Sequence, residues 1–124
     1  MINYLVPQNI SIGLKEKGFK EPCLFMYDKC ECFGKDLGGQ LEFSGRNYNS
    51  NPYCVSVPFY DQVSDWFRRE HKIHLEINYM DDLLLYQSKL TTLIDNTEIW
   101  ESGWKNQYYE AYDKGIIETL KLIQ

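Results

Sequence analysis

The 124-residue sequence has no apolar run that approaches the ~20 residues needed to span a bilayer. Its first residues, MINYLVPQNIS, also lack the basic start and the apolar stretch of a secretory signal peptide. We therefore expect a cytoplasmic protein that does not bind membranes. The chain is 44% hydrophobic and 25% charged, which is ordinary for a globular protein, and a single domain over residues 1–124 is expected.

Basic residues are also in short supply, with 13 Lys and Arg against 18 Asp and Glu and a net charge of −5. Nucleic-acid affinity depends largely on basic side chains that displace counterions, so direct binding of DNA or RNA is not expected. Between residues 76 and 101, six carboxylates accompany a single Lys. We expect this region to project negative potential towards a protein partner with a basic surface, the alternative being an ordinary solvated acidic surface.

Recognisable metal and phosphate motifs are missing as well. Structural zinc sites usually supply ligand pairs two to four residues apart at both ends, but here only Cys30 and Cys32 are close together, and Cys23 and Cys54 stand apart. The string KDLGGQ is neither a phosphate loop nor a dinucleotide fingerprint. We expect reduced cysteines, no bound metal and no cofactor.

No catalytic constellation is apparent either. His71 falls at the end of an expected helix, and His74 falls on the polar face of the following strand beside Glu76, without a third convergent group. Asp81 and Asp82 suit a turn and lack the spacing of a calcium loop. We expect no catalytic residues and no enzyme; the alternative is a small metal-dependent hydrolase that uses the His, Glu and Cys groups.

What the sequence does contain is a clear helix followed directly by a clear strand, in residues 58–79. Phe59, Val63, Trp66 and Phe67 fall on one face of a 3.6-residue repeat, and Ser56 is the expected N-cap. After residue 72 the period changes to two, which is typical of a half-buried strand. Its apolar face is formed by Ile73, Leu75, Ile77 and Tyr79.

A shorter helix and a hairpin are expected before this stretch. Residues 8–17 predict a helix that ends at Gly18 in a left-handed conformation, with Phe19 packing back on it. Residues 24–27 and 40–44 predict two strands joined by a turn region rich in Gly and Asp.

The other segments complete the expected order of helix, hairpin, helix, hairpin, helix. Residues 45–58 are polar and predict an exposed loop, whereas residues 83–93 predict a partner for the preceding strand, with a helix as the alternative. Residues 95–105 indicate an aromatic-rich connection or a short edge strand, and residues 105–123 a helix whose Gly115 permits a close approach to the sheet. The fold class is α+β, as a two-layer domain with an antiparallel sheet.

Aromatic residues are in excess, since ten Tyr, six Phe and three Trp make up 15% of the chain. Seven of them have no evident core face: Tyr48, Tyr53, Tyr60, Tyr86, Trp100, Trp104 and Tyr108. Tyr and Trp favour interfaces, so rings beside acidic groups predict a protein-binding patch; alternatively, these rings fill the core. The expected binding residues are Glu76, Asp81, Asp82, Asp95, Glu98, Trp100, Glu101 and Trp104.

Several short strings of the chain together resemble a known group of proteins. They are Leu14-Lys15, Gly18-Phe19, Glu21-Pro22-Cys23, Pro58, Gln62, Trp66-Phe67-Arg68 and Tyr108-Tyr109-Glu110-Ala111. This set resembles small bacteriophage and prophage proteins that have no assigned activity. The resemblance implies a non-enzymatic inhibitor of a host nucleic-acid-handling or defence effector, anti-CRISPR-like, whose acidic face competes with nucleic acid for a basic groove. A structural or assembly protein is a further alternative.

Overall fold

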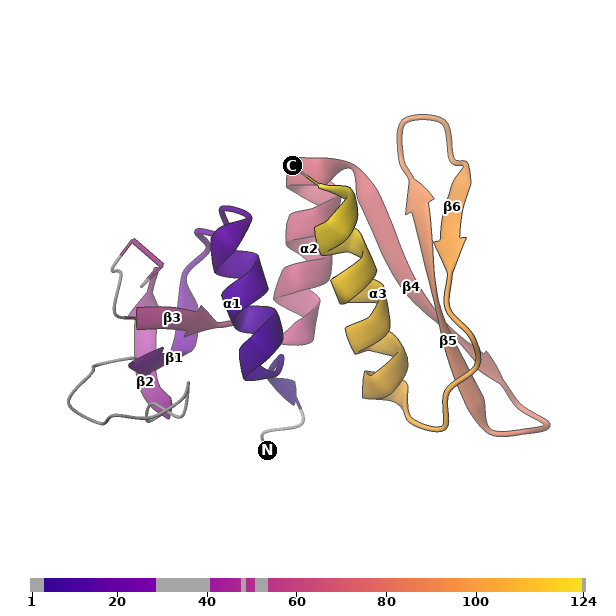
Figure 1. Ribbon diagram of the computed structural model, residues 1–124, viewed down its shortest axis with the longest axis horizontal. Coiled ribbons are helices and arrows are strands. Elements are labelled where there is room, and N and C mark those ends of the chain that lie inside the picture. The colour runs from indigo at the N-terminus through magenta and orange to yellow at the C-terminus, as the bar shows by residue number, and fades with distance from the viewer. Residues whose placement is uncertain (1–3, 29–40, 48, 51–53, 124) are drawn as a thin grey trace. The chain divides into compact units, whose positions relative to one another are not determined.

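The computed structural model describes residues 4–28, 41–47, 49–50 and 54–123 (Figure 1). In chain order the elements are α1 (Gln8–Glu16), β1 (Cys23–Asp28), β2 (Leu41–Arg46), β3 (Cys54–Val57), α2 (Tyr60–His71), β4 (Ile73–Met80), β5 (Leu85–Thr92), β6 (Glu98–Glu101) and α3 (Tyr108–Leu122). The α+β class is confirmed by these helices and by the two antiparallel sheets that the described strands form.

The chain divides into two compact units, Met1–Phe59 and Tyr60–Gln124. That the two units together form one domain stays a prediction. Each expected hairpin carries a third strand, β3 in the first unit and β6 in the second. The predictions for Cys30, Cys32, Tyr48, Tyr53 and the KDLGGQ string concern residues outside the described part of the chain.

In the first unit, α1 packs beside a sheet with the strand order β2-β1-β3. The helix ends as its sequence predicts, because Gly18 has a φ of 91°. The N–H groups of Gly18 and Phe19 donate to the carbonyl oxygens of Lys15 and Leu14 at 3.1 and 3.0 Å, which is a Schellman cap. Phe19 and Leu14 are both fully buried, so a hydrophobic contact accompanies the cap.

The prediction of an exposed loop over residues 45–58 is wrong for the end of that segment. Strand β3 pairs antiparallel with β1, for example at Tyr27↔Val55, and all four of its residues are buried. A short strand buried on both faces has no polar alternation, so the run CVSV among polar neighbours carried no strand signal. Ser56 is therefore not the N-cap of α2; it lies in β3 and its N–H donates to Asn49 Oδ1 at 2.8 Å.

In the second unit, α2 and α3 lie against one face of a sheet with the order β4-β5-β6 (Figure 1). The predicted change from helix to strand is confirmed, with Lys72 as the single residue between α2 and β4. Asp61 lies in the first turn of α2 and Arg68 and Arg69 in the last, as the helix dipole favours. The buried core includes Val63, Phe67, Leu75, Leu90, Ala111 and Ile116.

Segment 83–93 forms a strand, and the helical alternative is wrong. β5 pairs with β4 without interruption from Met80↔Leu85 to Ile73↔Thr92. Residues 81–84 form the turn, so two of the three consecutive leucines lie outside the strand and contribute nothing to its alternation. β6 lies within segment 95–105 and confirms the edge strand that was one of its two interpretations.

Candidate functional site

Polar side chains line the face of the second sheet that is turned away from the helices. Leu75 and Leu90 stand opposite each other in register, are buried, and lie on the helix side, where Gly115 of α3 approaches Leu75. Side chains alternate along a strand, so Glu76 and Lys89, which also stand opposite each other, point to the other side. The same alternation places four further polar residues there: His74, Asn78, Gln87 and Thr91.

A β-bulge brings two more carboxylates to this side. The register between β5 and β6 is Lys89↔Glu101, Leu90↔Trp100 and Thr91↔Glu98, with a shift between the last two pairs. The extra residue of the bulge lets Glu98 and Glu101 share the side of Lys89, whereas Trp100 lies beside Leu90 on the helix side. We call the surface around Glu76, Lys89, Glu98 and Glu101 the open face.

Three glutamates share the open face with one lysine. Glu76 and Glu101 flank Lys89 on the neighbouring strands, which in a sheet lie about 4.8 Å away on each side. Lys89 Nζ lies 3.2 Å from Glu98 Oε1, and because both side chains are partly exposed this ion pair contributes at most about 1 kcal/mol. The open face therefore keeps an excess of negative charge.

The net charge of the chain is concentrated in the second unit. Residues 60–124 contain twelve acidic and seven basic residues, so this unit carries the entire net charge of −5, and residues 1–59 sum to zero. The whole of this imbalance arises between residues 76 and 101, in the sheet and its turns. The field of the second unit thus favours positively charged partners.

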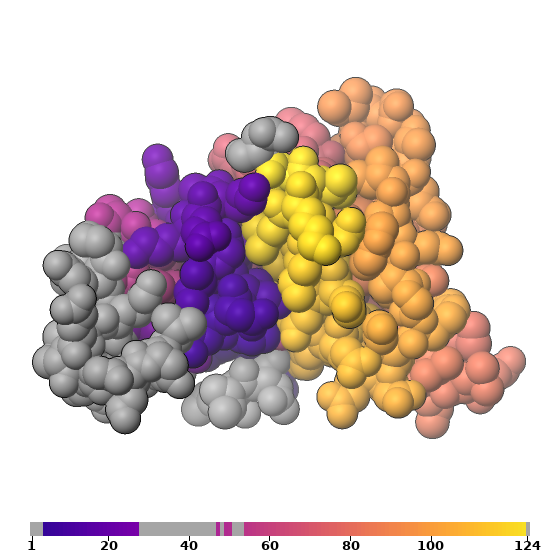
Figure 2. All heavy atoms as spheres, in the orientation of Figure 1, coloured from indigo at the N-terminus to yellow at the C-terminus, as the bar shows by residue number. Residues whose placement is uncertain are grey.

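The remaining expected binding residues are not gathered on the open face. Asp81 and Asp82 lie in the β4–β5 turn and Asp95 lies in the β5–β6 turn, at opposite ends of β5 (Figure 2). An eight-residue strand separates these turns by roughly 26 Å. Trp100 is half-buried on the helix side, and Trp104 is 40% exposed beyond the end of β6. The expected patch is therefore divided between the open face and two turns.

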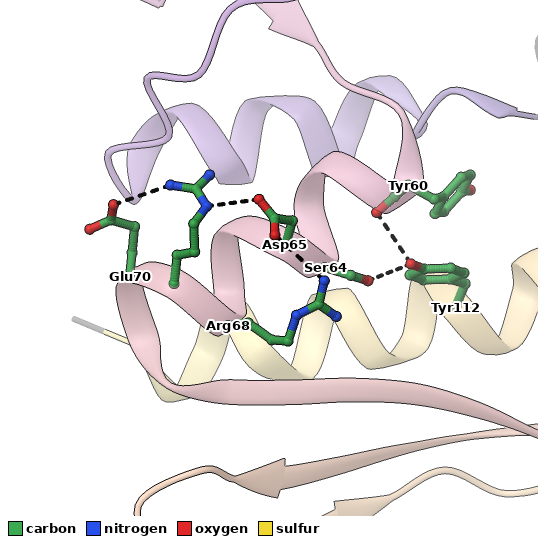
Figure 3. A network of polar contacts seen from close by, with 7 residues as sticks. Tyr60, Ser64, Asp65, Arg68, Glu70 and Tyr112 are labelled. Atoms are coloured by element: carbon green, nitrogen blue, oxygen red, sulfur yellow. Dashed lines mark hydrogen bonds and ion pairs between the residues drawn. The ribbon is translucent and has the colours of Figure 1, made fainter.

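Sequence reasoning missed a polar network that joins α2 to α3 (Figure 3). Tyr60 Oη donates to Asp113 Oδ1 at 2.6 Å. Tyr112 Oη donates to the carbonyl oxygen of Tyr60 at 3.2 Å, as Figure 3 shows. Ser64 Oγ is hydrogen-bonded to Tyr112 Oη; because that hydroxyl already donates its proton, Ser64 is the donor. The available signal was the four-residue spacing of Tyr60 and Ser64, which places both on one face of a helix.

This network is structural in character. Burial raises the pKa of Tyr60 and of Asp113, and it raises the pKa of Tyr112 to about 12. The two phenols thus stay protonated at neutral pH and supply hydrogen-bond donors to the helix pair. Tyr60 belongs to the core, whereas Tyr108 on the same helix pair is exposed. The rings of Tyr60 and Tyr112 also pack together, with centroids 4.7 Å apart.

Surface ion pairs follow α2 on its exposed side (Figure 3). Asp65 lies 2.7 Å from Arg69 Nε and 3.5 Å from Arg68 Nη2, and the Arg69 hydrogen bond lowers the pKa of Asp65. Arg69 also lies 3.7 Å from Glu70. Both arginines are therefore engaged with carboxylates of their own helix, which leaves less positive charge to offset the acidic sheet.

The groups expected for the hydrolase alternative are placed apart. His71 packs edge-on against Trp66, with ring centroids 4.7 Å apart, whereas His74 lies on the open face. Burial raises the pKa of Cys23 to about 12, so its thiol stays protonated, and Cys54 is buried in β3. Within the described part of the chain, no three His, Cys, Asp or Glu side chains come close enough to hold a metal ion.

Comparison of the chain with protein-family models, with curated proteins and with solved structures found no match. The resemblance to phage-encoded proteins therefore stays a prediction from the strings quoted above. Among the described residues, none of the helices has the length and apolar character required to cross a lipid bilayer.

Proposed function

We propose that this chain is a small, non-enzymatic protein-binding module that inhibits a host nucleic-acid-handling or defence effector. The observation that carries the proposal is the open face, where Glu76, Glu98 and Glu101 lie on the same side of the sheet as a single lysine, Lys89. The described helices of the unit lie on the opposite side of the sheet, so the open face is available to a partner. The resemblance to phage proteins suggests a setting in the host cytoplasm, with a CRISPR-Cas nuclease as one example of an effector.

Inhibition would follow from competition with nucleic acid. A groove that binds DNA or RNA presents Lys and Arg side chains to phosphate groups. An acidic sheet face can occupy the same side chains, and charge complementarity mainly sets how fast and how selectively the two proteins associate. Binding should therefore weaken as salt concentration rises, because exposed charges are screened over about 10 Å at 0.1 M salt.

The test reverses the charge of the open face. In one variant Glu76, Glu98 and Glu101 are each replaced by Lys; a matched control carries Lys in place of Glu70, Glu110 and Glu118, three α-helical glutamates of the same unit. Both variants have the same net charge, so a difference between them reports the position of the charge. Wild-type protein is immobilised, host lysate is passed over it, and captured proteins are identified by mass spectrometry.

We expect a nucleic-acid-binding protein that is captured by the wild type and by the control variant, lost with the open-face variant, and released by added DNA or RNA. Urea unfolding of all three proteins verifies that each variant is folded. Equal capture by the open-face variant, or captured proteins that nucleic acid does not displace, would contradict the proposal.

A further inference from the structure

The β4–β5 turn has a backbone conformation that its sequence does not favour. Leu84 has a φ of 54°, in the left-handed region that disfavours residues with a Cβ. At the β5–β6 turn the same conformation is adopted by Asn96, with a φ of 61°, and Asn is among the residues that tolerate it best. The geometry of the turn therefore does not account for a leucine at position 84.

Burial does not account for it either. Leu83 and Leu84 are each 64% exposed, so neither side chain contributes much to the core of the unit. Two adjacent leucines at the tip of a hairpin form an exposed apolar surface, and such surfaces in soluble proteins often mark interaction sites. Strained residues likewise cluster where a ligand or a partner is bound.

The stem beneath the turn is well fixed. Met80↔Leu85 is the last pair of the ladder, and the rings of the next pair, Tyr79↔Tyr86, pack against each other at a tilt of 37°, with centroids 5.0 Å apart. On its other side, Tyr86 exchanges two backbone hydrogen bonds with Lys105, at 2.8 and 2.7 Å. A rigid stem presents the two leucines with little loss of conformational entropy on binding.

Charge around the tip indicates what kind of pocket it fits. Asp81 and Asp82 are exposed beside the two leucines, and residues 75–88 contain neither Lys nor Arg. Lys105, opposite Tyr86 in the stem, contributes one positive charge against these two carboxylates. The local field repels an anionic lipid surface and attracts basic side chains. We propose that Leu83 and Leu84 insert into an apolar pocket of a protein partner, and that Asp81 and Asp82 pair with basic residues at its rim. This inference rests on the proposed function and assigns a second contact beside the open face.

The experiment uses photo-crosslinking from the tip. The full chain, carrying p-benzoylphenylalanine in place of Leu83, is illuminated in host lysate; a control chain carries the same group in place of Ile94, an 82% exposed residue of the other turn. Cross-linked peptides are then mapped by mass spectrometry. We expect position 83 to label one protein in a segment of apolar residues flanked by Lys or Arg, and position 94 not to label that protein.

Competition with unlabelled variants makes the assignment specific. Leu84→Gly relieves the left-handed strain, so its urea midpoint should equal or exceed that of the wild type. The concentration of this variant that suppresses the cross-link should nevertheless be about tenfold or more above that of the wild type. Ile94→Ser removes exposed apolar surface from the other turn and should compete as well as the wild type. Asp81→Asn with Asp82→Asn should compete less well, and its deficit should shrink at high salt.

The other outcomes overturn the inference in distinguishable ways. If Leu84→Gly competes as well as the wild type while the open-face variant fails to capture the partner, the binding role of the tip is contradicted and the proposed function is retained. Cross-links from position 83 only to a second copy of this chain would make the tip a self-association site. Co-sedimentation with vesicles of phosphatidylcholine and phosphatidylglycerol that is lost in Leu84→Gly would make it a lipid contact. A tip cross-link that persists with the open-face variant as the labelled chain would support the tip and contradict the open face as the main contact.

Discussion

Replacement of Gly115 by Ala tests how closely α3 approaches the second sheet. Gly115 is buried in the middle of α3, and a Cβ built there would overlap Cδ1 of Leu75 and lie 3.0 Å from Cβ of Ser88. The Leu75 methyl group ends a flexible side chain and can turn aside. The Ser88 Cβ is attached to the backbone of the central strand β5, so the helix itself has to move away.

Two opposing free-energy contributions decide the sign of the change. Ala is favoured over Gly in a helix interior by about 1 kcal/mol, whereas an extra methyl group in a packed core typically costs about 1–3 kcal/mol. Because the backbone-attached Ser88 cannot yield, we expect the packing cost to win. Gly115→Ala should therefore lower the free energy of unfolding by about 1–2 kcal/mol.

Urea unfolding followed by circular dichroism measures this change, and the chain supplies its own control. Gly103 is exposed, and a Cβ built there would have no neighbour within 4 Å, so Gly103→Ala should change the unfolding free energy by less than about 0.5 kcal/mol or stabilise slightly. Leu75→Val in the Gly115→Ala background removes the overlapping Cδ1 and should cost less than it does in the wild type. Stability equal to or above the wild type for Gly115→Ala would refute the close approach of α3 to β5.

Two further predictions concern local strain and the buried network. Lys72, between α2 and β4, has a φ of 57°, so Lys72→Gly should raise the urea midpoint and stabilise the fold by about 0.5–1 kcal/mol, and a lower midpoint would contradict this. Burial raises the pKa of Asp113, so the folded state binds the carboxyl proton more tightly than the unfolded chain does. The resulting stabilisation is present at acidic pH. It is lost as the pH rises through the unfolded and then the folded pKa of Asp113. Asp113→Asn should therefore gain stability relative to the wild type as the pH rises from the ordinary pKa of an aspartate through the raised pKa of Asp113, as measured by urea midpoints at each pH. A difference that stays constant with pH would show that Asp113 does not titrate with a raised pKa.

The elements that sequence reasoning found are those whose side chains meet different environments on their two faces. The change of period after residue 72 located α2, which has a buried and an exposed face, and β4, which begins with buried residues alternating with half-buried ones. Strand β3 is buried on both faces, and its polar member Ser56 interrupts the apolar run, so neither alternation nor a continuous apolar stretch was visible. A four-residue strand offers too few positions to overcome that loss of pattern.

The candidate site was likewise predicted only where the side-chain pattern indicated it. Alternation along β4 was sufficient to place Glu76 on a polar face. Glu98 and Glu101 lie on the same face because of a β-bulge. A bulge is a feature of backbone pairing, and the pattern of side chains in the sequence did not indicate it. The separation of Asp81 from Asp95 was, by contrast, implied by the expected hairpin, because its two turns must lie one strand length apart.

The carboxylates of β6 admit a second role that bears on the proposed function. β6 is an edge strand, and charged side chains on an edge discourage pairing with the edge of another molecule. Glu98 and Glu101 could thus serve to keep the chain monomeric without contacting a partner. Lysine protects a sheet edge at least as well as glutamate, so replacing both residues by Lys preserves edge protection and reverses only the complementarity to a basic surface. Replacing both by Gln removes the two properties together. If binding is lost in the Lys variant while the protein remains monomeric, edge protection alone does not explain these residues, and the open face is left as the reason for their charge.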